Sequence, residues 1–141
     1  MNQNSGKWMP VFAVLILLAG TLAAQTTEQY VDTKHSVILN QLIAGKGFKN
    51  KAVQMMVVDF PPMSRSPSHR HPCPTFGYVI SGEIISVFEG KTHHYKAGDS
   101  FYETPNGLHS DARNDSQKSP AKLLVIYVKD NEKPTFTIAT H

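Results

Sequence analysis

Two histidines, His69 and His71, stand one residue apart in the stretch SHRHPCPTFGY at residues 68–78. In an extended segment, residues two apart project from the same face, so both imidazoles can reach one ion while Arg70 faces away. Paired imidazoles suit a borderline divalent transition metal such as Mn, Fe, Ni, Cu or Zn. An isolated pair of this kind is more often only solvated in an exposed loop, so the assignment depends on the residues downstream.

The downstream residues follow a recognisable order. An apolar run ends in ISGE (80–83), and KAGD (96–99) and PNGLH (105–109) come after it. This order, with eleven residues from Gly98 to His109, resembles the cupin superfamily, whose two motifs have the general forms GxxxxxHxHxxxxExxxxxxG and GxxxxxPxGxxHxxxN. The chain is most similar to small exported bacterial single-domain cupins with tracts like SPxHRHPGPTFGYVLEGEI and AGDSWYEPPGxxH. The resemblance runs from about Ala52 to Val128.

This resemblance implies an all-β fold, a cupin jelly-roll (double-stranded β-helix) barrel of mainly antiparallel strands. It also implies one divalent transition metal in the barrel mouth, held by His69, His71 and His109. Three neutral imidazoles leave open positions for water, oxygen or substrate, which is typical of a catalytic site rather than a structural one.

The fourth ligand is where the chain departs from the family pattern. Counted back from Gly82, the position of the first-motif glutamate is Thr75, which offers no carboxylate. Glu103 is our candidate for a fourth ligand or a proton acceptor. It shares a strand face with Phe101, and the resemblance implies that this face turns into the barrel, where a carboxylate needs a neutralising partner. Alternatively, Glu103 sits at the rim, hydrogen-bonded to Tyr78 or to water; the sequence leaves both possibilities open.

Further residues are expected to line a pocket beside the metal, because aromatic surfaces commonly line small-molecule sites. These expected lining residues are Thr75, Phe76, Tyr78 and Phe101.

The remaining cysteine and terminal histidines are interpreted without a functional role. Cys73 is the only cysteine, so no intrachain disulfide can form, and we expect a passive loop residue. His35 and His141 lie near the ends of the chain and are expected to be solvated.

The rest of the chain predicts the β-strands that must position these residues. Short runs of period-2 or continuous apolar character alternate with Gly, Pro, Asn and Asp, which indicates many short strands in a sandwich or barrel. Ser64–Pro67 is expected to be a loop leading into a strand near the histidine pair. The predicted strands are 37–43, 52–60, 75–80, 83–88, 93–95, 100–103, 108–112, 123–128 and 136–138.

The first residues have the character of an export signal. Lys7 precedes a short apolar run at residues 11–19, and small residues follow as far as Ala24. The run is shorter than the roughly 20 apolar residues that span a bilayer, and Thr21 stands where a lipoprotein would carry its lipidated cysteine. We therefore predict a signal peptide at 1–24, a single barrel domain at 25–141, a periplasmic or secreted location, and no stable membrane anchor.

Composition restricts the partners and the chemistry. The net charge of +3 is scattered, with no Lys/Arg run, so nucleic acid is not an expected partner. A small-molecule ligand or substrate is expected, and the resemblance makes a homodimer plausible. The resulting hypothesis is an exported metal-dependent enzyme, oxygenase-like or a lyase or isomerase. The alternative is a non-catalytic module that binds a small ligand, which the missing carboxylate at Thr75 favours.

Overall fold

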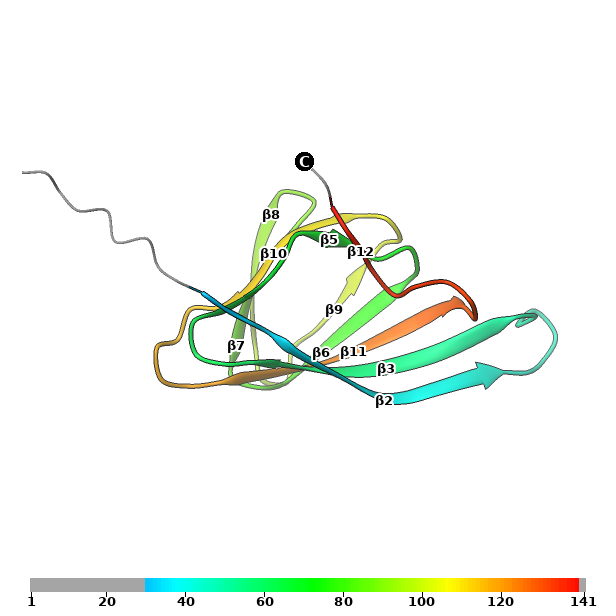
Figure 1. Ribbon diagram of the computed structural model, residues 1–141, viewed down its shortest axis with the longest axis horizontal. Coiled ribbons are helices and arrows are strands. Elements are labelled where there is room, and N and C mark those ends of the chain that lie inside the picture. The colour runs from blue at the N-terminus through cyan, green and yellow to red at the C-terminus, as the bar shows by residue number, and fades with distance from the viewer. Residues whose placement is uncertain (1–29, 140–141) are drawn as a thin grey trace, which may run out of the picture.

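Two curled sheets of mainly antiparallel strands face each other in the computed structural model, which describes residues 30–139 (Figure 1). One sheet contains, in spatial order, β2 (Lys34–Ile43), β3 (Lys51–Phe60), β11 (Ala121–Asp130), β6 (Thr75–Ser81) and β9 (Ser100–Glu103). The other sheet has the order β1 (Val31–Asp32), β4 (Ser64–Ser66), β10 (Leu108–Asn114), β5 (His69–Arg70) and β12 (Thr137–Ile138), with β7 (Glu83–Phe88) and β8 (Lys91–Lys96) joined to it through β10. The prediction of an all-β jelly-roll barrel is confirmed.

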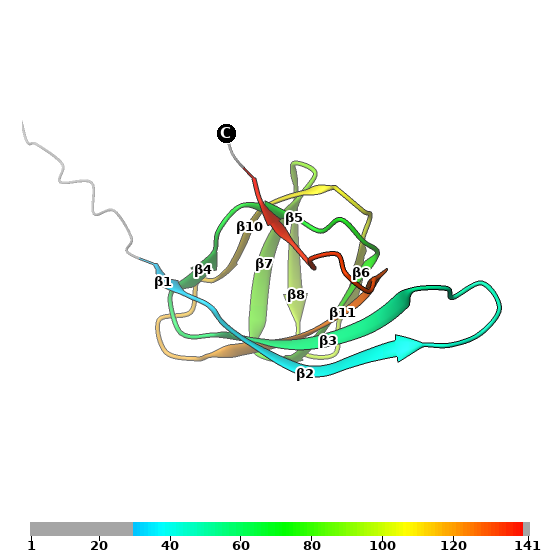
Figure 2. The ribbon, with the colours of Figure 1, turned by 45° about the vertical axis from the view of Figure 1, so that its right-hand side comes forward.

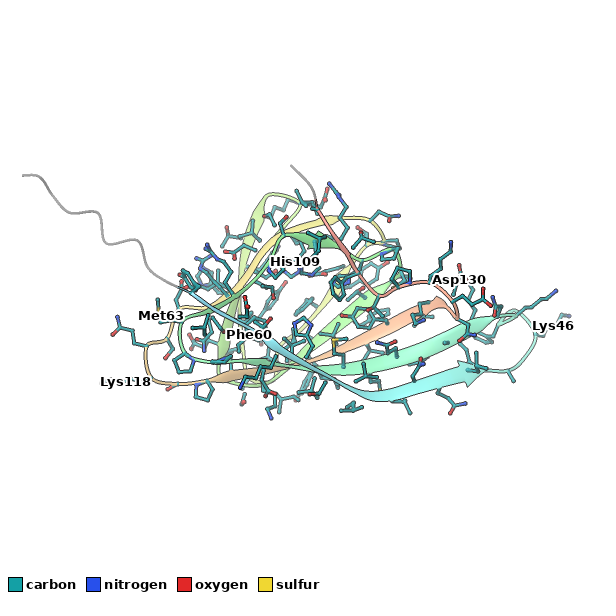
Figure 3. All side chains as sticks on the ribbon, viewed as in Figure 1. Lys46, Phe60, Met63, His109, Lys118 and Asp130 are labelled. Carbon is teal, nitrogen blue, oxygen red and sulfur yellow. The ribbon has the colours of Figure 1, made fainter. Side chains whose placement is uncertain are left out.

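Alternation along the strands places the core between the two sheets. In β11, every second side chain from Ala121 to Lys129 is buried, and in β6 the buried positions are Thr75, Gly77 and Val79. This period of two is the natural consequence of the pleated backbone. Figure 3 shows Phe60 and His109 between the sheets, with Lys46 and Lys118 at the periphery. The main cluster contains Met56, Val58, Phe60, Cys73, Val79, Ile84, Ala112, Ala121, Leu123, Val125 and Tyr127.

Two tight connections fix the register of β6, β7 and β8. Gly82 joins β6 to β7 with φ of 74°, and a Cβ there would lie 2.7 Å from Ala121, so this position needs glycine. Glu89 and Gly90 join β7 to β8 with φ of 48° and 73°. Two successive positive φ values match the right-handed twist of a hairpin, and both turns lie where the sequence predicts them.

The structure corrects one expected loop and confirms most of the predicted strands. Ser64–Ser66 forms β4, although serine rarely favours strands, because it pairs with β10 and buries Ser64 and Ser66. Tertiary pairing therefore overrides local propensity there.

The β2–β3 hairpin extends beyond the barrel, as Figure 2 shows at its right-hand side. Nearly every residue of β2 is consequently exposed. The part of the chain described contains no helix long and apolar enough to cross a membrane. The predicted signal peptide at 1–24 and His141 lie outside the described residues.

Candidate metal centre

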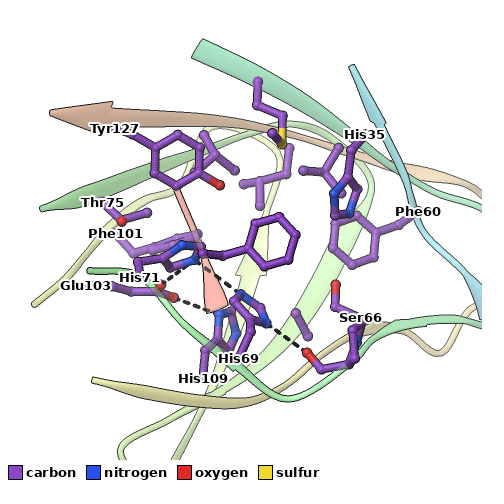
Figure 4. Close-up of a pocket in the computed structure, with 17 residues that line it drawn as sticks. His35, Phe60, Ser66, His69, His71, Thr75, Phe101, Glu103, His109 and Tyr127 are labelled. Atoms are coloured by element: carbon purple, nitrogen blue, oxygen red, sulfur yellow. Dashed lines mark hydrogen bonds and ion pairs between the residues drawn. The ribbon is translucent and has the colours of Figure 1, made fainter. Parts of the chain in front are cut away.

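Strand pairing brings the three predicted histidine ligands together. His69 of β5 and His109 of β10 are direct partners in an antiparallel pair, and His71 follows two residues after His69. One ring nitrogen from each of the three imidazoles lies within 4.8 Å of the others. The three rings lie close together in the lower half of Figure 4. Two distant segments, one from each motif, thus form one cluster.

Backbone carbonyls set the orientation of the first two imidazoles. The Nδ1 of His69 lies 2.8 Å from the carbonyl oxygen of Pro67, and the Nδ1 of His71 lies 2.7 Å from that of Thr135. A carbonyl can only accept, so each Nδ1 carries the hydrogen and each Nε2 keeps its lone pair. The two Nε2 atoms face each other at 3.2 Å. Two lone pairs cannot hydrogen-bond to each other, so this arrangement calls for a proton or a cation between them.

His109 is held from the opposite side by β7. The hydroxyl oxygen of Ser86 lies 2.9 Å from its Nε2, and both residues are buried. Its Nδ1 lies 3.2 Å from Oε1 of Glu103, without hydrogen-bond geometry, and has no other partner. Ser86 therefore turns the free nitrogen of His109 toward the carboxylate.

Glu103 faces into the barrel, as one of the two sequence alternatives predicts; the rim position is contradicted by an exposed fraction of only 2%. Its Oε2 lies 3.6 Å from the Nε2 of His71, and neither carboxylate oxygen accepts a hydrogen bond from the described residues. Glu103 is the direct cross-strand partner of Thr75. The carboxylate that position 75 lacks is thus supplied to the same barrel face by the adjacent strand.

Burial and charge set the ionisation of the cluster. Burial lowers the pKa of His69 to about 4, with a smaller contribution from the neighbouring imidazoles, and burial also lowers the pKa of His71. Burial alone would raise the pKa of Glu103, but the nearby imidazoles, His109 above all, outweigh it and hold this pKa below its ordinary value. At neutral pH, the imidazoles of His69 and His71 are therefore neutral and the carboxylate of Glu103 is ionised, the protonation states that a metal requires of these groups.

The turn between β9 and β10 ties Glu103 and His109 to the histidine pair. The backbone N–H of Asn106 donates to the carbonyl oxygen of His71 at 2.6 Å, and the guanidinium of Arg70 donates to the carbonyl oxygen of Asn106 at 2.6 Å. Asn106 has φ of 63°, a conformation that asparagine tolerates better than most residues. The Pro105-Asn106-Gly107 turn therefore keeps the two halves of the site in register.

The donor set fits a divalent transition metal. Imidazole nitrogens and a carboxylate oxygen suit Mn, Fe, Ni, Cu and Zn, and the two orphaned oxygens of Glu103 and the free Nδ1 of His109 are the atoms that a cation would satisfy.

A mostly apolar cavity opens beside the cluster (Figure 4). Its volume is about 60 Å³. Among the described residues, Glu103 is the only carboxylate that lines the cavity, and no Lys or Arg lines it. The cavity wall includes Met56, Phe60, Thr75, Phe101, Tyr127 and Phe136.

Two of the four expected lining residues lie at the cavity, and the other two do not. Thr75 and Phe101 line the cavity. Phe76 and Tyr78 do not; their side chains lie on the outer face of the sheet and are 43% and 46% exposed. Because neighbouring residues of a strand point to opposite faces, an inward Thr75 forces Phe76 and Tyr78 outward.

Several residues around the site have no signal in the sequence motifs. Ser86 and Tyr127 reach the site only through long-range strand pairing, and Phe136 covers it from the C-terminal segment. His35, expected to be solvated, is exposed but also lines the mouth of the cavity, 6.3 Å from the ring of Phe136. Cys73 is buried, and burial raises the pKa of its thiol, which agrees with a passive role.

A family model for the cupin domain matches residues 56–127. No curated protein matches the chain in sequence. Among solved structures, an uncharacterised conserved protein with a double-stranded β-helix domain from Klebsiella pneumoniae subsp. pneumoniae is 26% identical, with a TM-score of 0.59 over 78% of this chain and 86% of that protein.

Two enzymes share the fold. The DMSP lyase DddQ from Ruegeria pomeroyi is 20% identical, with a TM-score of 0.58 over 89% of this chain and 59% of that protein. An oxalate oxidase is 25% identical, with a TM-score of 0.52 over 61% of this chain and 45% of that protein. The chain thus spans less than two thirds of either enzyme.

Proposed function

The chain belongs to the cupin domain family, and we propose that it is an exported, metal-dependent enzyme that acts on a small organic molecule. The observation that carries the proposal is the 3.2 Å approach of the His69 and His71 Nε2 atoms, both left with lone pairs by their Nδ1 contacts. A buried site that only stabilised the fold would pair these nitrogens with donors.

The metal would be held by His69, His71 and His109, with Glu103 completing the set. Bound there, a divalent transition metal would supply Lewis-acid chemistry at a substrate oxygen. The carboxylate of Glu103 balances part of the cation's charge, and the presence of this carboxylate opposite Thr75 removes the main reason to favour a non-catalytic module.

Glu103 is also placed to handle a proton. Its lowered pKa keeps the carboxylate ionised at neutral pH, so it can accept a proton from a substrate in the cavity. Proton removal begins eliminations and isomerisations and prepares an enol or phenol for oxygenation. The proposed reaction is therefore oxygenase-like or that of a lyase or isomerase, and the similarity to oxalate oxidase supports the oxidative version.

The cavity walls determine the size and polarity of the substrate. Phe60, Phe101 and Met56 present apolar surface to the cavity. A small molecule with one oxygen-rich end and an apolar remainder fits them.

Elemental analysis of purified protein tests the metal site. We expect about one equivalent of a transition metal in the wild type and in His94→Ala, whose side chain is exposed on β8 away from the site. The variants His69→Ala and His109→Ala should lose it. Equal metal content in all four proteins would contradict the proposal.

Turnover separates an enzyme from a binding module. Metal-loaded wild type should consume oxygen or change a member of a panel of phenols, flavonoids, diketones and small organic acids, whereas the Glu103→Gln variant should not. Binding of a panel member without any conversion would instead assign the site to a non-catalytic ligand-binding protein.

Export is proposed from the Lys7–Ala24 pattern. Cell fractionation with N-terminal sequencing checks it. A mature protein in the exported fraction that begins near residue 25 is expected, and a cytoplasmic protein that retains residue 1 would contradict export.

A further inference from the structure

A buried tyrosine directs its hydroxyl into the cavity beside the candidate metal centre. Tyr127 of β11 lines the cavity and is only 3% exposed. Figure 4 shows its oxygen pointing into the cavity, on the side away from His109. The ring of Tyr127 packs beside the ring of His71, with centroids 5.2 Å apart. The hydroxyl therefore belongs to the cavity wall and not to the outer surface of the barrel.

This hydroxyl has no hydrogen-bond partner among the described residues. The two other hydroxyl side chains that line the cavity in the described part of the chain both have partners. Thr75 donates to the carbonyl oxygen of Cys73 at 3.1 Å, and the hydroxyl of Ser66 lies 3.5 Å from that of Thr33. Buried polar groups are normally paired, so an unpaired phenol aimed into a cavity indicates a polar group on the ligand.

Strand pairing sets the distance between this hydroxyl and the metal centre. Thr75 of β6 is the direct cross-strand partner of Tyr127 on one side and of Glu103 on the other. Adjacent strands lie about 4.8 Å apart, so the backbones of Tyr127 and Glu103 are roughly 10 Å apart. Both side chains are buried on the inner face and reach toward each other into one small cavity. A ligand only a few bonds long can therefore contact the metal centre and the phenol together.

The chemistry of the phenol selects a hydrogen-bond acceptor. A tyrosine hydroxyl ordinarily has a pKa of about 10, and burial raises the pKa of Tyr127 further, so the group keeps its hydrogen at neutral pH. The nearby walls formed by Phe101 and Phe136 offer this hydrogen no acceptor. No Lys or Arg of the described chain lines the cavity, so an uncharged carbonyl fits beside the phenol better than a second carboxylate.

We propose that the hydroxyl of Tyr127 donates a hydrogen bond to a carbonyl oxygen of the substrate while the metal centre binds an oxygen at the other end. The substrate is then a small oxo compound whose two oxygen-bearing ends are separated by a short apolar segment. This inference rests on the proposed function, because it takes the first oxygen to be held by a metal at His69, His71 and His109. It narrows the proposed substrate from one oxygen-rich end to two.

Calorimetric titration with matched pairs of acids tests the inference. Levulinate carries a keto oxygen where isocaproate carries a methyl group, and a second pair with the same replacement is one methylene longer. Zn²⁺-loaded wild type should bind at least one oxo acid about tenfold more tightly than its methyl counterpart, the usual size of one neutral hydrogen bond. In Tyr127→Phe this preference should disappear, while the affinity for the methyl acids stays as in wild type.

Tyr95→Phe is the matched control. Tyr95 stacks on Phe101 with ring centroids 4.7 Å apart but does not line the cavity, so this variant should keep the preference of wild type. The zinc content of each protein is measured in the same samples. A wild type that binds no zinc would overturn the metal-dependent function and this inference with it. A wild type that holds zinc but binds the oxo acids no better than the methyl acids would overturn the inference alone.

The variants decide the remaining outcomes. A preference that persists in Tyr127→Phe would assign the carbonyl to a different group of the cavity. An equal loss of affinity for both acids of a pair, or the same loss of preference in Tyr95→Phe, would mean that ring packing and not the hydroxyl is responsible. Far-ultraviolet circular dichroism checks the fold. A Tyr127→Phe variant that fails to fold would also contradict the inference, because the hydroxyl would then support the barrel itself.

Discussion

The two faces of the β6–β9 strand pair reverse the usual distribution of polarity. Toward the barrel they carry Thr75 and Glu103, which are 1% and 2% exposed; toward the outside they carry Phe76 and Tyr102, which are 43% and 51% exposed. Globular proteins normally bury apolar side chains and rarely bury an acidic one without a partner. The same two strands therefore break the rule twice, in opposite directions.

The two reversals differ in kind, because only the inner one leaves buried polar atoms without a partner among the described residues. A buried carboxylate is costly unless a positive group neutralises it, which is why the inner face indicates a cation. The exposed aromatic pair of the outer face leaves apolar surface in contact with water. One strand pair can serve both surfaces because the pleat separates them completely.

Exchanging the inner residues Thr75 and Glu103 should have the largest effect on metal affinity. Glu103→Thr removes the carboxylate, and we expect the affinity for Mn, Zn or Co to fall by at least about 100-fold, since even outer-shell ligand partners contribute 10–100-fold. The double variant Thr75→Glu/Glu103→Thr returns the carboxylate to the same face from the adjacent strand. It should recover most of the lost affinity, as measured by calorimetric titration.

Glu103→Gln is the control for the exchange, because it keeps the side-chain volume and removes the charge. Its affinity should resemble that of Glu103→Thr. If Glu103→Gln bound metal as tightly as wild type, the carboxylate would not be a ligand. A double variant no better than Glu103→Thr would show that the position on β9 matters as well as the face.

Gly77→Ala should disturb the packing that separates the two faces. Gly77 is the cross-strand partner of Phe101, and a Cβ at Gly77 would lie 2.1 Å from the Phe101 ring. The ring must move, so we expect the free energy of unfolding to fall by about 1–3 kcal/mol, the usual cost of overpacking. Urea denaturation measures this change.

The double-mutant cycle with Phe101→Leu identifies the cause. A shorter side chain at position 101 leaves room for the new methyl group, so Gly77→Ala should cost clearly less in that background. Equal costs in both backgrounds would mean that the ring of Phe101 is not what requires glycine at position 77.

The histidine cluster could be predicted because its signal is local. The two-residue offset of His69 and His71 and the eleven-residue offset of Gly98 and His109 are properties of the chain itself. The strands that carry them have clear alternation and turn residues. The inward position of Glu103 was one of two open alternatives, because only the pairing of β9 with β6 decides it.

The positions that the sequence missed depend on pairing or on strand parity. Ser86 lies 23 residues before His109 and reaches it only through the β7–β10 pair. Phe76 and Tyr78 do not line the cavity, because Thr75 of the same strand points inward. One extended strand cannot direct all three side chains to the same face. The period of two along β6 places Phe76 and Tyr78 on the outer face once Thr75 points inward.

Ser86→Ala should have the smallest effect, because Ser86 contacts the inner face of the site only through His109. Its hydroxyl fixes the ring nitrogen that His109 presents to Glu103, so we expect about a tenfold loss of metal affinity, the lower end for outer-shell partners. The visible spectrum of Co²⁺-loaded protein should change as well, since the imidazole can rotate. Ser110→Ala is the matched control: its hydroxyl donates to the Val87 carbonyl oxygen and to no imidazole, so affinity and spectrum should stay as in wild type. An unchanged spectrum in Ser86→Ala would mean that β10 alone holds the ring of His109. The hydroxyl of Ser86 would then have no part in orienting this imidazole toward Glu103.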